Sequence, residues 1–258
     1  MKEYILKNTI DKMRYHDFDG KGLPILFIHG LGCAGSFDYP NVATQHELLE
    51  NRRILVDLLG SGYSDKPIAF DYSVKSHATY LYDFVNELGL EKFVLFGHSF
   101  GGSVALSLAE LCKDKVSGVI LSEANLDSGG GFTSKGIASF EMNDFIVEGF
   151  DKIVSESRAS LNEMWAASLS IWLPQAAYLV SKSLINGQTP SWREIFYSLG
   201  CSKTFIYGDK SLPDSDMEIL IDNGICIEIV ENAGHSMAWE NPKGLAEAIK
   251  NGIERCAK

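Results

Sequence analysis

One serine of this sequence has the neighbours of a reactive nucleophile. Residues 93–103 read FVLFGHSFGGS, so an apolar run ends in the pattern G-x-S-x-G, and residues 104–111 have a helical composition. This pattern between a buried strand and a helix predicts a tight turn that strains the backbone of Ser99 and projects its hydroxyl above the sheet. Gly97 and Gly101 leave room for the turn, and the helix N-terminus beneath Ser99 would stabilise negative charge. The alternative is a structural turn without chemistry.

Three further motifs join this turn in the order and spacing of a known superfamily. They are HGLG at 29–32, DLLGSGYS at 57–64 and AGH at 233–235. Together with the turn at Ser99 they resemble the α/β-hydrolase superfamily over nearly the whole chain. The resemblance implies an α/β-hydrolase fold, with a mostly parallel sheet flanked by helices and a helical cap inserted after the sixth strand.

The resemblance also implies which residues act with Ser99. The family places its general base in the loop after the last strand, where this chain has His235, and a surface histidine is the alternative. The family's oxyanion donors are backbone N–H groups, which here belong to Leu31 and Phe100. A plain turn at the end of a strand is the alternative for the loop that contains Leu31. Asp57 lies where the family has a bracing residue, so we expect a structural role for it.

The acid that would orient His235 is where the sequence departs from the commonest family pattern. That pattern has an aspartate three residues after the glycine that ends a strand at Gly208, and this chain has Ser211 there. Another arrangement in the superfamily puts the acid at the end of the strand that comes after the helix following Ser99. In this chain that position is Glu123. A carboxylate there would be costly to bury without a partner such as His235. We therefore favour Glu123 over Asp209, the alternative being a glutamate that pairs with the cap or is exposed.

These residues predict acyl transfer to a serine. Ser99 would attack a carbonyl while His235 takes its proton, and water activated by the same histidine would release the acid. The predicted protein is a serine hydrolase, most simply a carboxylesterase, that cleaves a small apolar ester, thioester, lactone or amide without a metal or an organic cofactor. Serine in place of aspartate argues against haloalkane dehalogenase and the usual epoxide hydrolase chemistry. Two alternatives stay open, namely a ligand-sensing hormone-type receptor on the same fold and a carbon–carbon bond hydrolase, lyase or acyltransferase.

The elements that would position these residues alternate along the chain. Two antiparallel edge strands are expected within residues 3–17, and further strands are expected at 25–28, 53–56, 93–96, 118–122, 203–209 and 225–230. Helices are expected at 73–88, 104–111, 213–222 and 242–256. This order predicts a parallel sheet with helices on both faces and a ligand site at the carboxyl ends of the strands. The predicted core comprises residues 1–124 and 200–258.

The predicted cap comprises residues 125–199. It opens with three glycines at 129–131 and is rich in large apolar side chains. Each of these side chains could line an apolar acyl pocket or hold the cap to the core. The candidates are Met142, Phe145, Phe150, Met164, Trp165, Trp172, Tyr178 and Trp192.

The composition limits the possible partners. A length of 258 residues with 45% hydrophobic and 22% charged side chains suits one large soluble domain. The net charge of −11 argues against nucleic acid or an anionic membrane as a partner and leaves a small-molecule substrate. The N-terminus lacks the pattern of a signal peptide and no apolar run is long enough to span a bilayer, which predicts a cytoplasmic protein. The five widely spaced cysteines predict reduced thiols rather than disulfides or a zinc site.

Overall fold

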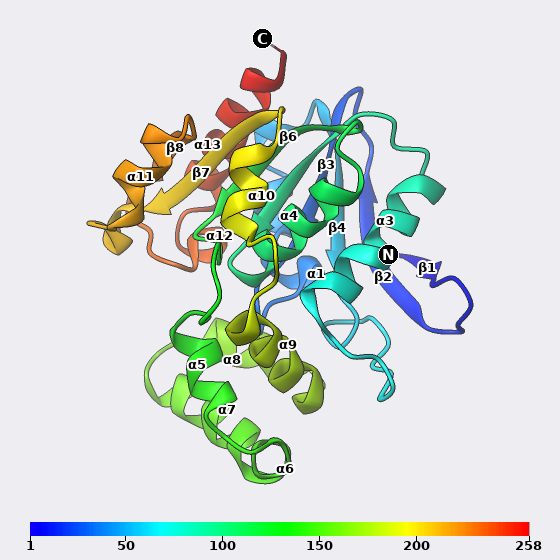
Figure 1. Ribbon diagram of the computed structural model, residues 1–258, viewed down its shortest axis with the longest axis vertical. Coiled ribbons are helices and arrows are strands. Elements are labelled where there is room, and N and C mark those ends of the chain that lie inside the picture. Colours follow the sequence, from blue (N-terminus) through cyan, green and yellow to red (C-terminus); the bar gives the residue numbers. More distant parts are fainter. Residues whose placement is uncertain (258) are drawn as a thin grey trace.

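The chain forms an eight-stranded sheet with helices on both faces in a computed structural model that describes residues 1–257 (Figure 1). The strand order is β1-β2-β4-β3-β5-β6-β7-β8. Strands β1 and β2 run antiparallel to their neighbours and all other pairs are parallel, so the predicted α/β-hydrolase fold is confirmed. The strands are β1 (Lys2–Ile5), β2 (Lys12–Phe18), β3 (Gly22–Ile28), β4 (Asn51–Asp57), β5 (Phe93–His98), β6 (Val116–Ser122), β7 (Ser202–Gly208) and β8 (Cys226–Val230).

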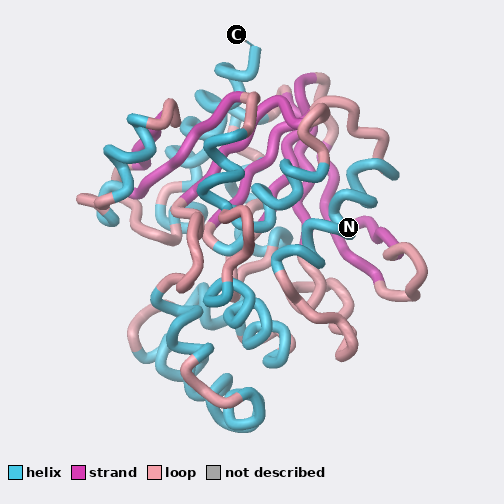
Figure 2. The backbone as a smooth tube through the Cα atoms, in the orientation of Figure 1, coloured by secondary structure: helices cyan, strands magenta, loops and turns pink. Residues whose placement is uncertain are grey.

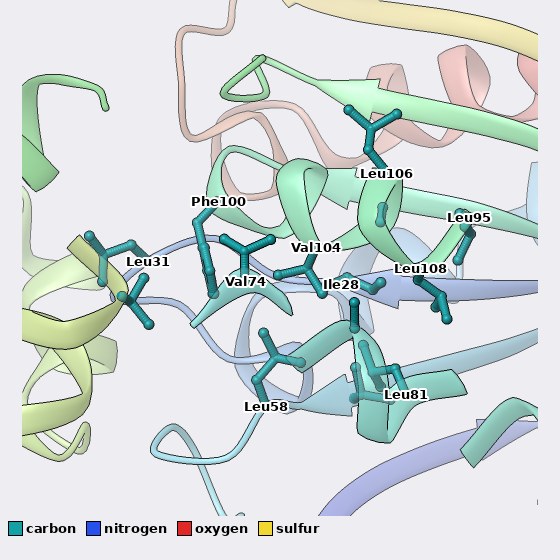
Figure 3. Close-up of a cluster of buried hydrophobic side chains, with 14 of the residues drawn as sticks. Ile28, Leu31, Leu58, Val74, Leu81, Leu95, Phe100, Val104, Leu106 and Leu108 are labelled. Atoms are coloured by element: carbon teal, nitrogen blue, oxygen red, sulfur yellow. The ribbon is translucent and has the colours of Figure 1, made fainter. Parts of the chain in front are cut away.

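The central strands are continuous apolar runs because the sheet is covered on both faces. Along β3, Leu26 and Ile28 contribute to one buried cluster, whereas Ile25 and Phe27 contribute to a second cluster on the opposite face. This alternation follows from the two-residue period of a strand. Figure 3 shows Ile28 within the first cluster, together with apolar side chains of the helices that cover this face.

Two long helices cover the first face of the sheet. They are α3 (Val74–Glu87) and α4 (Phe100–Leu111), which pack against each other while α4 also packs on β5. Ser73 caps α3 by accepting a hydrogen bond from the amide of Ser76. The opposite face is covered by α13 (Pro242–Glu254), which begins with a proline and is capped by Asn241. Helix α4 starts at Phe100, directly after the candidate nucleophile Ser99, which is four residues before the predicted start at residue 104.

Shorter helices complete the loops around the sheet. They are α1 (Gly35–Asp38), α2 (Pro40–Ala43), α11 (Asp216–Asp222) and α12 (Met237–Glu240). The prediction started α11 at residue 213, but the Asp214 carboxylate accepts a hydrogen bond from the amide of Asp216 at 2.8 Å. Because an aspartate side chain that binds a nearby amide competes with the helix, α11 begins later than the sequence pattern indicated.

Helices also fill the segment between β6 and β7. They are α5 (Phe132–Ala138), α6 (Met142–Asp144), α7 (Phe150–Ala159), α8 (Glu163–Leu169), α9 (Pro174–Asn186) and α10 (Trp192–Ser198). The first five lie together below the sheet, whereas α10 lies beside α4 (Figures 1 and 2). Trp192 anchors α10 there by donating to Ser107 Oγ of α4 at 3.1 Å. The division of the chain at residue 199 stays a prediction, since α10 precedes it and packs on the core.

Two expectations from composition concern cysteines and membranes. All five cysteines are free thiols. Over residues 1–257, no helix combines the length and the apolar character that crossing a bilayer would require. The expected cytoplasmic location goes beyond these observations and stays a prediction.

Candidate active site

Ser99 lies at a strained turn between β5 and α4. Its backbone has φ +50° and ψ −121°, a conformation that a non-glycine residue adopts only where its surroundings hold it. The Ser99 amide donates to the carbonyl of Ser122 at 2.9 Å, and its carbonyl accepts from the amide of Gly102 at 2.9 Å. A side chain built on Gly101 would lie 2.3 Å from the carbonyl oxygen of Ile28, so glycine is required there. The strand–turn–helix arrangement predicted from the sequence is therefore present.

A short hydrogen bond joins Glu123 to His235. Nδ1 of His235 lies 2.7 Å from Oε2 of Glu123, and Oε1 of the same carboxylate accepts from the amide of Gly208 at 3.0 Å. Burial alone would raise the pKa of Glu123, but the nearby polar groups of His235, Ser211 and Gly208 outweigh burial and lower the pKa to about 2. Ser211, which stands where the commonest family pattern has aspartate, lines the same cavity as Glu123.

Asp209 has a different set of partners. Its carboxylate accepts hydrogen bonds from the amides of Asn232 at 2.9 Å and Ala233 at 3.0 Å, and these amides lower its pKa. Asp209 therefore braces the loop that leads to His235. The geometry pairs Glu123, and not Asp209, with His235, while the catalytic roles of all three stay predictions.

The low pKa of Glu123 predicts an acid-dependent contribution to stability. In the unfolded chain a glutamate has a pKa of about 4.3. As pH falls below that value the unfolded state takes up a proton while folded Glu123 stays ionised, so the contribution is present above about pH 4.3 and lost toward pH 2. We expect the difference in unfolding free energy between wild type and Glu123→Gln to shrink between pH 5 and pH 3, measured by urea unfolding. A constant difference would contradict the pairing.

The two predicted oxyanion donors lie at the sides of Ser99. Phe100 is the first residue of α4, and Leu31 belongs to the turn after β3. A methyl group built on Gly30 would lie 3.4 Å from Cβ of Ser99, which places this turn against the candidate nucleophile. Within residues 1–257, the amides of Leu31 and Phe100 have no hydrogen-bond acceptor. Leu31 lines the cavity that contains Ser99, whereas Phe100 is buried and is not among the cavity's described lining residues, so the oxyanion role of both amides stays a prediction.

His98 lies directly beneath the candidate base. Its ring centroid is 4.6 Å from that of His235, and its Nδ1 donates to the carbonyl of Ser122 at 3.1 Å. Burial, followed by the neighbouring His235, lowers the pKa of His98 to about 3. A neutral imidazole thus packs against the ring of His235. Nothing in the pattern G-x-S-x-G of the sequence indicates this long-range contact.

A cavity of about 470 Å³ contains the candidate residues. Ser99, Glu123 and His235 line it together, and within residues 1–257 the Ser99 hydroxyl has no hydrogen-bond partner. Of the eight large cap side chains singled out in the sequence, all of which the structure describes, Trp165 lines the cavity. Phe132 and Leu184 also line it, and the sequence analysis did not identify either. Most of the eight instead pack inside the molecule.

The charge of the cavity is one-sided. Its lining contains the carboxylates of Glu123, Asp214 and Asp216, and no lysine or arginine is among the described lining residues. Arg193 reaches Asp216 at 2.6 Å from outside this lining, whereas the donors to Asp214 among residues 1–257 are uncharged. No group of three His, Cys, Asp or Glu side chains suited to a metal ion occurs over residues 1–257.

Two further aspartates fix the loops around the cavity. Asp57 accepts from the amides of Ser36 at 2.8 Å and Tyr63 at 2.9 Å, so its expected structural role is confirmed. Asp38 is buried and accepts from the amide of Ala34 at 2.7 Å. Asp38 also accepts from the indole N–H of Trp239 at 2.8 Å, and Trp239 lies in α12, which begins two residues after His235. Burial raises the pKa of Asp38 to about 6.

Asp38 thereby links the segment after the turn that contains Leu31 to the helix that follows the loop of His235. The sequence analysis did not identify it, because no local motif relates it to a tryptophan 201 positions away. The link that Asp38 makes between these two segments is therefore visible only in the tertiary structure.

Relatives of the chain carry different activities. The chain is 34% identical over 111 residues to haloalkane dehalogenase 2 of Mycobacterium tuberculosis (strain ATCC 25618 / H37Rv), and 36% identical over 107 residues to 2-hydroxymuconate semialdehyde hydrolase of Pseudomonas putida. These matches cover 43% and 41% of this chain and 37% of either relative. The chain thus spans little more than a third of the length of the curated relatives that it matches.

Solved structures resemble the chain over its whole length. An esterase from Thermogutta terrifontis superposes with a TM-score of 0.80 at 22% identity and covers 100% of this chain and 99% of its own. An N-acyl homoserine lactonase superposes with a TM-score of 0.79 at 18% identity, covering 100% and 98%. At such identities the likeness shows the fold alone. The family model described as alpha/beta hydrolase fold matches residues 24–193. Since that model covers more than half of the chain, the chain belongs to the alpha/beta hydrolase family.

Proposed function

We propose that this alpha/beta hydrolase is a serine hydrolase that cleaves a small, uncharged ester, thioester, lactone or amide through an acyl-enzyme. The observation that carries the proposal is the bond between His235 and Glu123 in the cavity that also contains Ser99. A carboxylate on Nδ1 keeps the other ring nitrogen of His235 free to accept a proton from a nucleophile. The strained turn at Ser99 supplies that nucleophile at the same cavity.

The proposed reaction has two stages. Ser99 attacks the carbonyl carbon, His235 takes the hydroxyl proton, and the leaving group departs with that proton. Water then attacks the acyl-enzyme with the same histidine as base, which releases the acid and restores Ser99. The free N–H groups of Leu31 and Phe100 stabilise the oxyanion in both stages. The hydrogen bond between Ser99 and His235, which is not made among the described residues, would form when substrate binds, because catalytic hydrogen bonds are often long or poorly aligned without substrate.

The charge of the cavity supports an uncharged acyl group. A substrate carboxylate would face Glu123 and Asp214 without a cationic side chain in the described lining to offset the repulsion. This disfavours the alternative of a carbon–carbon bond hydrolase that acts on an anionic substrate. Serine in place of aspartate at position 99 likewise disfavours haloalkane dehalogenase and the usual epoxide hydrolase chemistry.

A matched set of methyl esters tests this charge preference. We expect kcat/KM for methyl butyrate to exceed that for monomethyl succinate by at least about tenfold, because like charges repel in a partly buried site. Monomethyl succinamate, which is similar in shape but uncharged, should behave like the butyrate. The ratio of kcat/KM for the butyrate to that for the succinate should be smaller in Asp214→Asn than in wild type. Equal rates for the succinate and the succinamate would contradict it.

The proposal as a whole is tested with a substrate panel. Purified wild-type protein is assayed against short-chain p-nitrophenyl esters, thioesters, lactones and amides, with Ser99→Ala as the control. Turnover by wild type that is lost in the variant supports a hydrolase. Absence of turnover across the panel, together with saturable ligand binding, would instead favour the receptor alternative. Product analysis with added alcohols or amines distinguishes hydrolysis from acyl transfer.

A further inference from the structure

Two tryptophans of the predicted cap hold the turn that contains Leu31. Trp165 of α8 donates its indole N–H to the carbonyl oxygen of Leu31 at 3.0 Å. Trp172, between α8 and α9, donates to the carbonyl oxygen of Cys33 at 2.8 Å. These bonds join positions 134 and 139 residues apart, so neither follows from local sequence. The segment 125–199 therefore contacts the backbone of the turn as well as the cavity.

The first of these bonds fixes the conformation of the turn. Gly32 has φ +78°, and the amide of Cys33 donates to the carbonyl of Gly30 at 3.2 Å, which is the arrangement of a type II turn. The peptide group between Leu31 and Gly32 has opposite orientations in type I and type II turns. The bond from Trp165 to the carbonyl of Leu31 holds this peptide in the type II orientation. A side chain built on Gly32 would lie 2.4 Å from Nε1 of Trp165, so the indole lies directly on the turn.

The second bond supports the start of the turn. Trp172 is buried and its ring meets that of His29 edge to face, with centroids 5.8 Å apart. His29 donates from Nδ1 to the carbonyl of Gly30 at 2.8 Å and accepts at Nε2 from the amide of Leu58 at 3.0 Å. Trp172 thus holds both the carbonyl of Cys33 and the histidine that fixes Gly30.

We propose that Trp165 and Trp172 are positioning residues for the oxyanion donor Leu31, so that the cap segment and the oxyanion turn assemble together. The inference rests on the proposed function, because the amide of Leu31 matters only if Ser99 attacks a carbonyl. Movement of the cap away from the core breaks both indole bonds and frees the turn to change its conformation. Its return restores them, and chemistry is thereby confined to the closed arrangement.

Phenylalanine substitutions remove each indole N–H and keep an aromatic ring. Trp165→Phe and Trp172→Phe should each lower kcat by about 10- to 100-fold with little change in KM, because a misplaced oxyanion donor acts mainly on the transition state. Trp192→Phe is the matched control, since it removes the indole bond from Trp192 of α10 to Ser107 of α4, which lies away from the turn. Its kcat should stay close to that of wild type. Affinity for a trifluoromethyl ketone, whose adduct with Ser99 carries the oxyanion, should fall in parallel with kcat.

A second measurement reports on the turn without turnover. Hydrogen exchange of the peptide that spans residues 29–36 should become faster in Trp165→Phe and Trp172→Phe, but not in Trp192→Phe. Unchanged kcat and unchanged exchange in the first two variants would overturn the inference. A raised KM with unchanged kcat would overturn it as well, because Trp165 would then only contact substrate. If wild type hydrolyses nothing, the proposed function fails, and the exchange data still decide whether the indoles hold the turn.

Discussion

Ser99→Ala should reduce hydrolysis by at least about 10⁴-fold, because the variant loses the atom that forms the acyl-enzyme. The fold should be retained. The turn at Ser99 is held by backbone bonds to Ser122 and Gly102, and neither bond uses the hydroxyl. We expect a melting temperature within about 3 °C of wild type, since the hydroxyl makes no hydrogen bond to a described residue.

Ser181→Ala is the matched control for this loss. Ser181 is buried in α9 and donates to the carbonyl of Ala177 at 2.7 Å, but it does not line the cavity. Its removal should leave kcat close to that of wild type. Residual activity in Ser99→Ala above about a hundredth of wild type would contradict the assignment, because another group would then act as the main nucleophile.

Glu123→Gln should lower kcat by about 10⁴-fold through the wrong tautomer of His235. The amide of Gly208 donates to Oε1 of Glu123, so the carbonyl oxygen of a glutamine would keep that position. Its NH₂ group would then face Nδ1 of His235 and force that nitrogen to act as an acceptor. The proton would move to the nitrogen that must receive the hydroxyl proton of Ser99. The same substitution also removes the charge that stabilises the imidazolium.

Asp209→Asn separates this effect from a general disturbance of the loop. Asp209 accepts from the amides of Asn232 and Ala233, which lie just before His235. An asparagine keeps one acceptor, so kcat should fall by less than about tenfold. Steady-state kinetics of both variants over pH 5–9 provide the comparison. A severe loss in Asp209→Asn with a mild one in Glu123→Gln would transfer the acid role to Asp209.

The features that the sequence predicted are those with a local physical cause. The central strand around Ile25 is a continuous apolar run because both faces of the sheet are covered, and the turn at Ser99 needs glycines that the sequence displays. The pairing of Glu123 with His235 could be anticipated because both residues follow strands whose carboxyl ends meet at one edge. The start of α11 could not be anticipated, because it depends on the single side chain of Asp214, which accepts a hydrogen bond from the amide of Asp216.

The features that the sequence missed depend on contacts between distant segments. Asp38 and Trp239, or Trp165 and Leu31, have no shared motif, and only the tertiary structure brings them together. Aromatic composition alone overestimated the cap's contribution to the cavity, since a tryptophan such as Trp192 packs equally well on the core. Hydrophobicity indicates that such a side chain is buried, but not which neighbours it is buried against.

The most direct test of the account is the site of covalent labelling by a fluorophosphonate. Wild-type protein is treated with the probe, digested, and analysed by mass spectrometry, with Glu123→Gln and Ser181→Ala treated in parallel. The account predicts one adduct per chain, on Ser99, with slower labelling in Glu123→Gln and an unchanged rate in Ser181→Ala. An adduct on another serine, or no adduct on a protein that still hydrolyses esters, would contradict it.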